Sequence, residues 1–469
     1  MSEHTFDLLV IGGGPGGYVA AIRAAQLGMK TALVEKAQLG GVCLNWGCIP
    51  TKALLRSADV LRMVRGAAQF GVKAQPPEAN LPAMVARSRA VAAQLNKGVT
   101  GLLKKNGVQV FTGHARLQGG GTVAVTGEGG ATQVLRAAHI VLATGARARQ
   151  LPQLPADGQS VWTYREALTP PAVPKRLLIV GAGAIGIEFA SFYRAVGADV
   201  TVVEMAPRVL PLEDEEVSAQ VAASLKKDGI HVHTQVALEQ AQRVQGAWQL
   251  TLRPQGSGSA LKVQVQAEVV LVAAGIVGNA EDLGLEKTRV QVEKTHIVTD
   301  AQCRTAEPGV YAIGDVAGPP WLAHKASHEG VLCVEHIAGL HPHALDPRRV
   351  PACTYSHPQV ASVGWTEAQA KAAGRAVKVG KFPFSANGKA IAMGATAGFA
   401  KVVFDAASGE LLGAHMVGEE VTEMIQGFAI AQSLETTEAE LMATIVPHPT
   451  MSESMHEAVL AAFGRALHI

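Results

Sequence analysis

Cys43 and Cys48 stand close together in the segment GVCLNWGCIPTK, with four residues between them. Closely spaced cysteines bind a metal, form a structural disulfide or carry out redox chemistry. A zinc site takes about four ligands, usually with a second cysteine or histidine pair nearby, and no such pair follows in the sequence. A structural disulfide is unusual in a cytoplasmic protein. Redox chemistry is therefore the favoured interpretation, with the other two as alternatives.

The residues from Cys48 onward, CIPTKALLRSADVLRMV, predict a helix with Pro50 in its first turn, where proline is tolerated. A thiolate at this position lies at the positive end of the helix dipole, which lowers its pKa. The remaining cysteines are Cys303, Cys333 and Cys353. They are distant from one another in the sequence, and we expect them to be ordinary buried core residues.

A glycine-rich stretch near the start of the chain predicts a dinucleotide-binding unit that could exchange electrons with these cysteines. The residues FDLLVIGGGPGGYVAAIRAAQLGMKTALVEK read as a strand over residues 6–11, a turn, a helix and a strand that ends at Glu35. Gly12 allows the tight turn, Gly14 lets the backbone approach a pyrophosphate, and Gly17 lets the helix pack closely on the strand. Glu35 can accept hydrogen bonds from a ribose diol.

The same pattern recurs 169 residues further along the chain. The stretch RLLIVGAGAIGIEFASFYRAVGADVTVVE carries Gly181, Gly183 and Gly186 and ends at Glu204. A lone GxGxxG motif is weak evidence. Two copies between a strand and a helix, each followed by an acid at the same distance, are strong evidence. We therefore expect two nucleotide sites in one chain.

Glu204 also predicts which nucleotide the second site prefers. A carboxylate at the end of this strand suits a ribose 2′-hydroxyl and repels a 2′-phosphate, so we expect NAD rather than NADP. Arg208 lies four residues further on and weakens the argument slightly, because an arginine can accept a phosphate.

Connections rich in proline and glycine divide the chain. We expect a first domain over residues 1–150, a second over 151–275, a central segment over 276–348 and a C-terminal domain over 349–469. Inside the second domain, RVQGAWQLTLRPQGSGSALKVQVQAE alternates like a hairpin with a Gly/Ser turn. After about residue 350 the glycine motifs stop, and strands followed by helices indicate an α+β domain.

Composition excludes several classes of function. The net charge is only +2, so the chain offers no basic field for nucleic acid. No run of 18 apolar residues predicts a membrane span. The apolar strand begins within six residues of Met1, which leaves no room for a signal peptide, so we expect a location in a bacterial-type cytoplasm. A mature organellar protein would look the same.

Five stretches together make the chain resemble the pyridine nucleotide–disulfide oxidoreductases. They are GGVCLNWGCIPTK, the two glycine units, GVYAIGDVAGPPWLAHKA and PHPTMSE, which cover nearly the whole chain in the order of that family. The narrower resemblance is to the members that oxidise dihydrolipoamide with FAD and NAD. It implies an α/β fold with two Rossmann-like dinucleotide-binding domains, for FAD and NAD, and a C-terminal α+β dimerisation domain.

The resemblance assigns residues to the two nucleotides, with Asp315 on the ribityl chain of FAD and Trp321 to His324 near the isoalloxazine ring. The residues implied for FAD are Gly12, Gly14, Gly17, Glu35, Lys36, Gly41, Val42, Lys52, Ala115, Thr144, Gly145, Ala146, Asp315, Trp321, Leu322, Ala323 and His324. The residues implied for NAD are Gly181, Gly183, Ile185, Gly186, Glu204, Val236 and Gly275. No metal is implied.

The resemblance also assigns catalytic roles. Cys48 becomes the flavin-side sulfur and Cys43 the sulfur that exchanges with substrate. Lys52 is expected near flavin N5, paired with Glu188; alone, both residues would be interpreted as solvated helix charges.

His448 and Glu453 lie five residues apart in the PHPTMSE motif. The resemblance makes His448 the acid/base for the cysteine of the other subunit of a homodimer, oriented by Glu453. An imidazole held by a carboxylate can take and return the thiol proton. Alone, a His–Pro turn is more often structural.

The implied partner is a lipoyl-bearing acyltransferase or carrier protein of a 2-oxo acid dehydrogenase or glycine-cleavage complex. The rivals are members that reduce glutathione disulfide with NADPH, against which Glu204 argues, and members that reduce mercuric ion with a cysteine pair near the C-terminus. The last cysteine here is Cys353. A non-enzymatic flavin-bearing subunit is disfavoured by the intact Cys43, Cys48, His448 and Glu453.

Three positions depart from the family pattern. Ile276 and Gly278 stand in GIVGN where relatives usually carry an arginine and a proline, and Val446 stands where a second histidine is frequent. The first two lie on the loop expected on the NAD side.

Overall fold

The computed structural model describes residues 4–255 and 262–469, which form two compact units. The first unit comprises residues 1–54, 82–149 and 275–345. The second comprises residues 55–81, 150–274 and 346–469. The long helix α3 (Cys48–Arg65) begins at the second redox cysteine, as predicted, and continues into the second unit.

The first unit is built on a seven-stranded sheet in the order β3-β2-β1-β6-β5-β4, with β19 paired to β6. Strands β1, β2, β3, β6 and β19 pair in parallel, in a register that places Ile11 beside both Val34 and Leu142. Their carboxyl ends therefore meet at one edge, where ligands bind in open α/β sheets. The strands are β1 (His4–Ile11), β2 (Thr31–Glu35), β3 (Gln109–Thr112), β4 (His114–Gly119), β5 (Thr122–Thr126), β6 (Thr132–Leu142) and β19 (Val310–Ala312).

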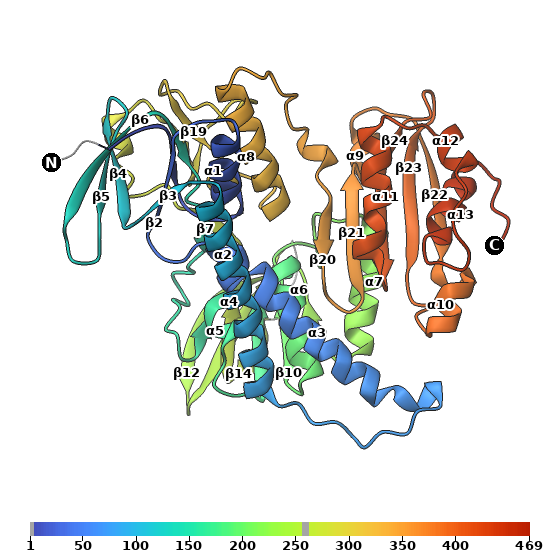
Figure 1. The fold of residues 1–469 in the computed structure, drawn as a ribbon. Helices are drawn as coiled ribbons and strands as arrows, with labels where there is room; N and C mark the ends of the chain where they lie inside the picture. Colours follow the sequence, from blue (N-terminus) through green and yellow to red (C-terminus); the bar gives the residue numbers. More distant parts are fainter. Residues whose placement is uncertain (1–3, 256–261) are drawn as a thin grey trace. The chain divides into compact units, whose positions relative to one another are not determined.

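Helices cover this sheet because its strands are apolar on both faces; Leu8, Leu9 and Val10 are fully buried. Figure 1 shows α1 (Pro15–Gln26) and α8 (Ala323–Ile337) side by side, and their small residues permit close packing. The remaining elements of the unit are α2 (Gly41–Trp46), α4 (Leu81–Lys105), β7 (Ala146–Ala148), β16 (Ile276–Gly278), η2 (Leu285–Lys287), β17 (Val292–Glu293), β18 (His296–Ile297) and η3 (Gly314–Ala317).

The second unit contains a five-stranded parallel sheet in the order β11-β10-β9-β15-β8. A three-stranded antiparallel sheet, β12-β13-β14, lies between β11 and β15 in the sequence and confirms the predicted hairpin strands; its predicted Gly/Ser turn falls at residues 256–261, outside the described residues. The elements are η1 (Ala67–Phe70), β8 (Val161–Trp162), α5 (Tyr164–Leu168), β9 (Arg176–Val180), α6 (Ala184–Ala195), β10 (Asp199–Val203), α7 (Glu215–Lys227), β11 (His231–His233), β12 (Val236–Val244), β13 (Ala247–Pro254), β14 (Val263–Ala267) and β15 (Val269–Val272).

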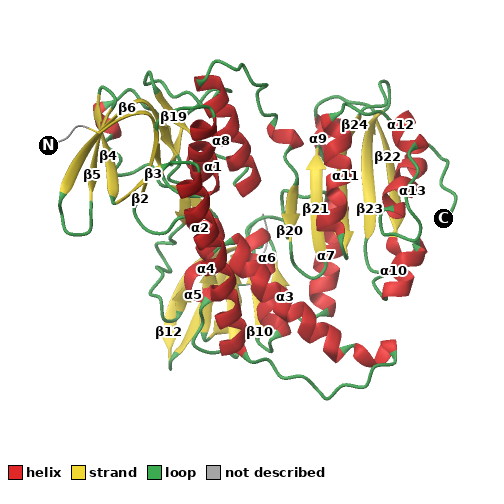
Figure 2. Ribbon diagram, in the orientation of Figure 1, coloured by secondary structure: helices red, strands yellow, loops and turns green. Residues whose placement is uncertain are grey.

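The C-terminal part of the second unit is the predicted α+β domain. Its antiparallel sheet has the order β20-β21-β24-β23-β22, and α11 and α13 pack against it around Phe382, Phe404 and Phe428 (Figure 2). The elements are η4 (Pro347–Arg349), β20 (Ala352–Thr354), β21 (Gln359–Gly364), α9 (Glu367–Ala372), β22 (Val377–Pro383), η5 (Phe384–Ala386), α10 (Gly388–Met393), β23 (Phe399–Asp405), β24 (Leu411–Gly418), α11 (Val421–Ser433), α12 (Glu438–Ala443) and α13 (Glu453–Ala462).

A buried ion cluster joins this domain to α7. Lys401 Nζ lies 3.0 Å from Asp214 Oδ1, 2.8 Å from Glu216 Oε2 and 2.9 Å from Glu367 Oε2. These carboxylates raise the pKa of Lys401 against the opposing effect of burial. The neighbouring Glu213 has a buried Oε2 without a hydrogen bond in the described part of the chain, and burial raises the pKa of Glu213 to about 7.

Candidate active site and nucleotide sites

The first glycine turn has a geometry that only glycine permits. Gly12 has a φ of +108°, and a Cβ added to it would lie 2.3 Å from the carbonyl oxygen of Ala143. A Cβ on Gly17 would lie 1.8 Å from the oxygen of Gly12, so α1 begins in direct contact with the turn. Glu35 fastens the turn from the next strand, because its Oε2 accepts a 2.7 Å hydrogen bond from the N–H of Gly13.

The second turn repeats this geometry almost atom for atom. Gly181 also has a φ of +108°, and a Cβ on Gly186 would lie 2.0 Å from its oxygen. The carboxylate of Glu204 accepts hydrogen bonds from the N–H of Ala182 at 2.7 Å and of Ala206 at 2.8 Å. At Gly12, Gly17, Gly181 and Gly186 a Cβ would clash with a backbone carbonyl oxygen, so both turns require glycine at these positions.

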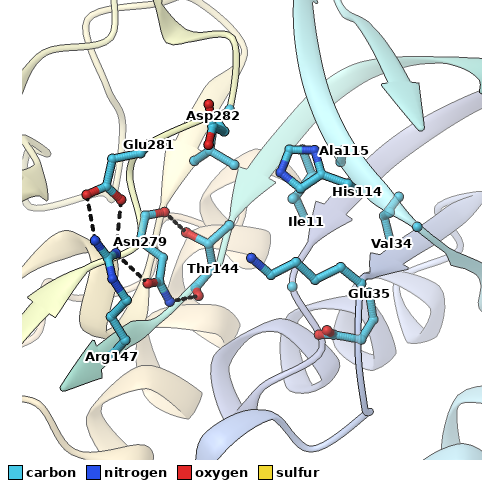
Figure 3. A pocket seen from close by; sticks show the side chains of 14 residues that line it. Ile11, Val34, Glu35, His114, Ala115, Thr144, Arg147, Asn279, Glu281 and Asp282 are labelled. Atoms are coloured by element: carbon cyan, nitrogen blue, oxygen red, sulfur yellow. Dashed lines mark hydrogen bonds and ion pairs between the residues drawn. The ribbon is translucent and has the colours of Figure 1, made fainter. Parts of the chain in front are cut away.

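A cavity of about 370 Å³ opens beside the first turn, at the carboxyl ends of β1 and β2 (Figure 3). It brings together five of the residues predicted for FAD, namely Gly12, Glu35, Lys36, Ala115 and Thr144. Residues that the sequence did not single out complete its lining, namely Ile11, Val34, Gly113, His114, Arg147, Asn279, Glu281, Asp282 and Leu283. The cavity and the glycine cradle fit the nucleotide end of FAD.

One wall of this cavity is an interlocked polar cluster. Arg147 binds both carboxylate oxygens of Glu281, at 2.8 and 3.0 Å, and the side-chain oxygen of Asn279 at 2.9 Å. Asn279 exchanges hydrogen bonds with Thr144, as Figure 3 shows. The Arg147 guanidinium and the Lys36 ammonium lower the pKa of Glu281, which therefore stays ionised. Asn279 directly follows the GIVG segment, and this position is the feature of the sequence that could have identified it as part of the site.

Asp315, predicted for the ribityl chain, follows β19 at the same sheet edge. Burial raises the pKa of Asp315, and the Lys325 ammonium opposes that rise. Lys325 is itself buried, 2.9 Å from Glu329, whose other oxygen accepts the N–H of Gly314. Lys325 and Glu329 were missed, although their spacing of four residues on a helix was a signal.

Trp321, predicted near the isoalloxazine ring, stacks on His296 with ring centroids 5.7 Å apart. Its indole N–H donates to His296 Nε2 at 3.2 Å. Gly278, one of the departures from the family, makes this possible, because a Cβ there would lie 2.3 Å from the oxygen of Thr295. Glycine at position 278, where relatives usually carry proline, therefore leaves room for the turn that carries His296.

The redox cysteines lie on consecutive helices, Cys43 on α2 and Cys48 at the first position of α3. Their thiols share a hydrogen bond, which together with burial raises the pKa of Cys43, while the Lys52 charge opposes the rise. Within this reduced pair Cys43 holds its proton, so a base is needed to make it a thiolate nucleophile.

Helix α4 holds the redox segment in place. Ser88 donates a 2.8 Å hydrogen bond to the oxygen of Pro50, and Arg89 donates one of 2.5 Å to the oxygen of Asn45. The Arg89 guanidinium also lies 4.3 Å from the centre of the Trp46 ring. These contacts tie the backbone between the two cysteines, and just after Cys48, to α4.

The expectation of buried core cysteines is confirmed for Cys303 and Cys333, whereas Cys353 is only partly buried. Cys303 and Cys333, 30 residues apart, are in contact, because Cys303 adopts a left-handed backbone with φ +63° and the chain returns to α8. Their shared hydrogen bond and burial raise the pKa of Cys333. As buried thiols they are unreactive.

The C-terminal domain supplies a second candidate for chemistry. His448 Nδ1 lies 2.8 Å from Glu453 Oε1, and the imidazole side chain is 78% exposed. Near it in the sequence, Ile430, Leu434 and Ile445 are large apolar residues that are 51%, 72% and 95% exposed in the single chain. This domain therefore presents both an oriented imidazole and apolar side chains to its surroundings.

The predicted residues divide between the two units. The FAD set, Cys43, Cys48, Lys52 and Gly275 belong to the first unit. Glu188, His448, Glu453 and the rest of the NAD set belong to the second. Glu188 is buried and accepts the N–H of Tyr355, while Val236 donates its N–H to the oxygen of Glu204. Ile185 is 43% exposed on the first turn of α6. The pairing of Lys52 with Glu188 stays a prediction.

Comparison with known proteins gives a consistent result. The family model described as pyridine nucleotide-disulphide oxidoreductase matches residues 6–330, and that of its dimerisation domain matches residues 350–459. The chain is 54% identical to the dihydrolipoyl dehydrogenase of Zymomonas mobilis, with 100% of both chains covered, and 47% identical to that of Bacillus subtilis, with 99% of both covered.

A solved structure agrees with these relatives. The crystal structure of LpdA from Mycobacterium tuberculosis matches with a TM-score of 0.90 and 27% identity, covering 97% of this chain and 99% of the other. Among residues 4–255 and 262–469, no helix has the length and apolar character needed to cross a lipid bilayer.

Proposed function

Because this chain belongs to the pyridine nucleotide-disulphide oxidoreductase family, we propose that it acts as a dihydrolipoyl dehydrogenase, which oxidises dihydrolipoamide to lipoamide. It uses FAD and NAD⁺, as the family does. The observation that carries the proposal is the hydrogen-bonded pair Cys43–Cys48, which lies in the same unit as the first glycine cradle and its cavity.

Each nucleotide is assigned to one cradle. The first turn, Glu35 and the cavity of Figure 3 would hold FAD, with Asp315 toward its ribityl chain. The second turn and Glu204 would hold NAD. When bound, FAD accepts two electrons from the cysteine pair and delivers them as a hydride to NAD⁺.

The cysteines carry out the exchange with substrate. In the oxidised enzyme, a thiolate of dihydrolipoamide attacks the sulfur of Cys43, forming a mixed disulfide and releasing Cys48 as a thiolate. The second thiolate of the substrate then attacks the substrate sulfur of the mixed disulfide and displaces Cys43. Lipoamide leaves with a closed disulfide, and Cys43 receives the electron pair and a proton.

His448 is the proposed acid/base for these proton transfers. The Glu453 carboxylate holds Nδ1, so Nε2 is the nitrogen that can take a thiol proton and return it to Cys43. The dimerisation domain indicates a homodimer, and we assign His448 to the cysteines of the partner subunit. Lys52, paired with Glu188, would favour electron transfer from Cys48.

Four segments would share this work: the FAD domain with the redox pair over residues 1–150, the NAD domain over 151–275, a central part completing the FAD site over 276–348, and the dimerisation domain over 349–469. The physiological substrate is a lipoyl group on the acyltransferase or carrier protein of a 2-oxo acid dehydrogenase or glycine-cleavage complex. The location consistent with such a partner is the cytoplasm of a bacterial-type cell.

A paired assay tests the function. Purified protein should reduce NAD⁺ with dihydrolipoamide, and should show little oxidation of NADPH with glutathione disulfide. Activity in the second assay alone would replace the proposal by its glutathione-directed rival.

A further inference from the structure

Arg208 lies beside the second glycine turn, on the loop between β10 and α7. The loop is fastened to the turn at one residue: Leu210 donates its N–H to the oxygen of Ala182 at 2.8 Å, and Ala182 donates its own N–H to Glu204. The loop therefore borders the carboxylate that would bind the ribose 2′-hydroxyl of NAD. A free arginine here would attract a 2′-phosphate and favour NADP.

The guanidinium of Arg208 is already engaged. Its Nη1 lies 3.1 Å from Glu215 Oε1, and its Nη2 donates to the oxygen of Pro211 at 3.3 Å. Its Nε is buried and makes no hydrogen bond within residues 4–255 and 262–469. Two of the three nitrogens thus point at protein acceptors, and the side chain is only 34% exposed.

Glu215 is well placed to hold this arginine. It is the first residue of α7, whose N-cap is Asp214, and Asp214 is anchored by the buried Lys401. The start of α7 is therefore anchored through Asp214, and Glu215 presents its carboxylate from the next residue. The ion pair cancels the Arg208 charge, while Glu204 keeps its own negative charge next to the ribose position.

We propose that Glu215 is a specificity-determining residue that withdraws Arg208 from the coenzyme and so excludes a 2′-phosphate. Two effects then act together. The Glu204 carboxylate repels the 2′-phosphate directly, and the Glu215 carboxylate pairs with the Arg208 guanidinium, which would otherwise attract that phosphate. The inference rests on the proposed assignment of NAD to the second cradle.

The test is a mutant cycle read by kinetics and by binding. In Glu215→Ala, kcat/KM for NADP⁺ relative to NAD⁺ should rise by up to about fivefold, the limit set by the worth of an exposed ion pair, because Arg208 is then free to bind the phosphate. The affinity for adenosine 2′,5′-bisphosphate, measured by calorimetry without turnover, should rise in parallel. Glu215→Asp, which keeps the charge on a shorter side chain, should give a smaller rise.

The Arg208→Ala background tests whether the change in coenzyme preference depends on Arg208. In Arg208→Ala, the further change Glu215→Ala should leave the NADP⁺/NAD⁺ ratio unaltered. Asp199→Asn removes one negative charge from the opposite end of β10, where Asp199 is exposed, and it should not move the ratio. It controls for the general effect of net charge.

Three outcomes would overturn the proposal: an unchanged ratio in Glu215→Ala, a rise that persists without Arg208, or an equal rise in Asp199→Asn. Glu215 is 70% exposed, and an exposed ion pair contributes little to stability, so the variants should fold. A failure of the NAD assignment itself is distinguishable, because Glu204→Gln would then leave the KM for NAD⁺ unchanged.

Discussion

Glu453 holds His448 through one carboxylate oxygen, at 2.8 Å from Nδ1, and uses the other to accept the N–H of Thr450, also at 2.8 Å. Both oxygens are therefore fixed, and so is the orientation of the imidazole. These hydrogen bonds outweigh desolvation and lower the pKa of Glu453, so the carboxylate is charged at neutral pH and supports a positive imidazole.

Glu453→Gln should reduce dihydrolipoamide oxidation less than His448→Gln does. Loss of the base should cost about a hundred- to ten-thousandfold, the usual span for a general acid/base. Loss of the carboxylate leaves the imidazole in place without the partner that orients it, so part of the activity should remain. Both variants should oxidise NADH with an artificial acceptor almost normally, since that half-reaction bypasses the dithiol. A loss of both activities would indicate misfolding instead.

Mixing inactive subunits tests whether the site is shared. Homodimers of Cys43→Ser and of His448→Gln should each be inactive toward dihydrolipoamide. After subunit exchange, the heterodimers contain one site with both residues intact. Activity should return to about a quarter of the wild-type value per subunit, if each pairing acts independently. Demonstrated exchange without recovered activity would place His448 at its own chain's cysteines.

The reactivity of Cys43 should depend on its neighbour. The hydrogen bond with Cys48 raises the pKa of Cys43, so Cys48→Ala should lower that pKa. In reduced protein, alkylation of Cys43 by iodoacetamide should accelerate several-fold at neutral pH, and its pH midpoint should move downward. Peptide mapping identifies the alkylated residue, and Cys333 serves as an internal buried standard. Slower alkylation would contradict the hydrogen-bonded arrangement.

Glu204→Gln should weaken NAD⁺ far more than dihydrolipoamide. A ligand hydrogen bond to a charged group contributes roughly 1.5–3 kcal/mol, so the KM for NAD⁺ should rise about ten- to a hundredfold. The amide keeps one acceptor, so one of the two backbone N–H groups of Ala182 and Ala206 loses its hydrogen bond in this variant. Equal effects on both substrates would remove Glu204 from the coenzyme site.

The pKa of Glu213 predicts how stability varies with pH. The folded-state pKa is about 7, above the usual value of 4.5, so the folded protein binds a proton more tightly than the unfolded chain. This stabilisation is fully present below pH 4.5 and is lost as the pH rises to 7. The loss amounts to about 3 kcal/mol.

Glu213→Gln should therefore flatten the fall in Tm between pH 5 and 8 and should exceed the wild-type Tm at pH 8. Differential scanning calorimetry across this range gives both curves. Identical slopes in the two proteins would show that Glu213 ionises normally.

The features that the sequence predicted best are those set by local spacing. Gly12, Gly17 and Glu35 lie within one βαβ unit, so hydrophobic pattern and glycine chemistry determine their positions together. The start of α3 at Cys48 was likewise readable from Pro50 and the apolar pattern that follows.

What could not be predicted depends on long-range packing. Arg147 and Glu281 are 134 residues apart and meet only because β16 pairs with β7. The contact of Cys303 with Cys333 follows from a left-handed residue that no turn signal marked. The engagement of Arg208 by Glu215 depends on how a loop folds back onto the glycine turn, which side-chain type does not reveal.

The exposure of Ile430, Leu434 and Ile445 affects a newly synthesised subunit before it dimerises. A subunit that folds before it meets another displays these side chains to water, and such surfaces associate indiscriminately. Dimerisation is second order in the concentration of subunits. The time that a subunit spends as an aggregation-prone monomer therefore lengthens when synthesis slows or the sample is diluted. Non-specific association also requires two subunits to meet, so its balance with correct pairing depends on the exposed side chains themselves, and replacing these three residues by serine should slow aggregation of the unpaired subunit.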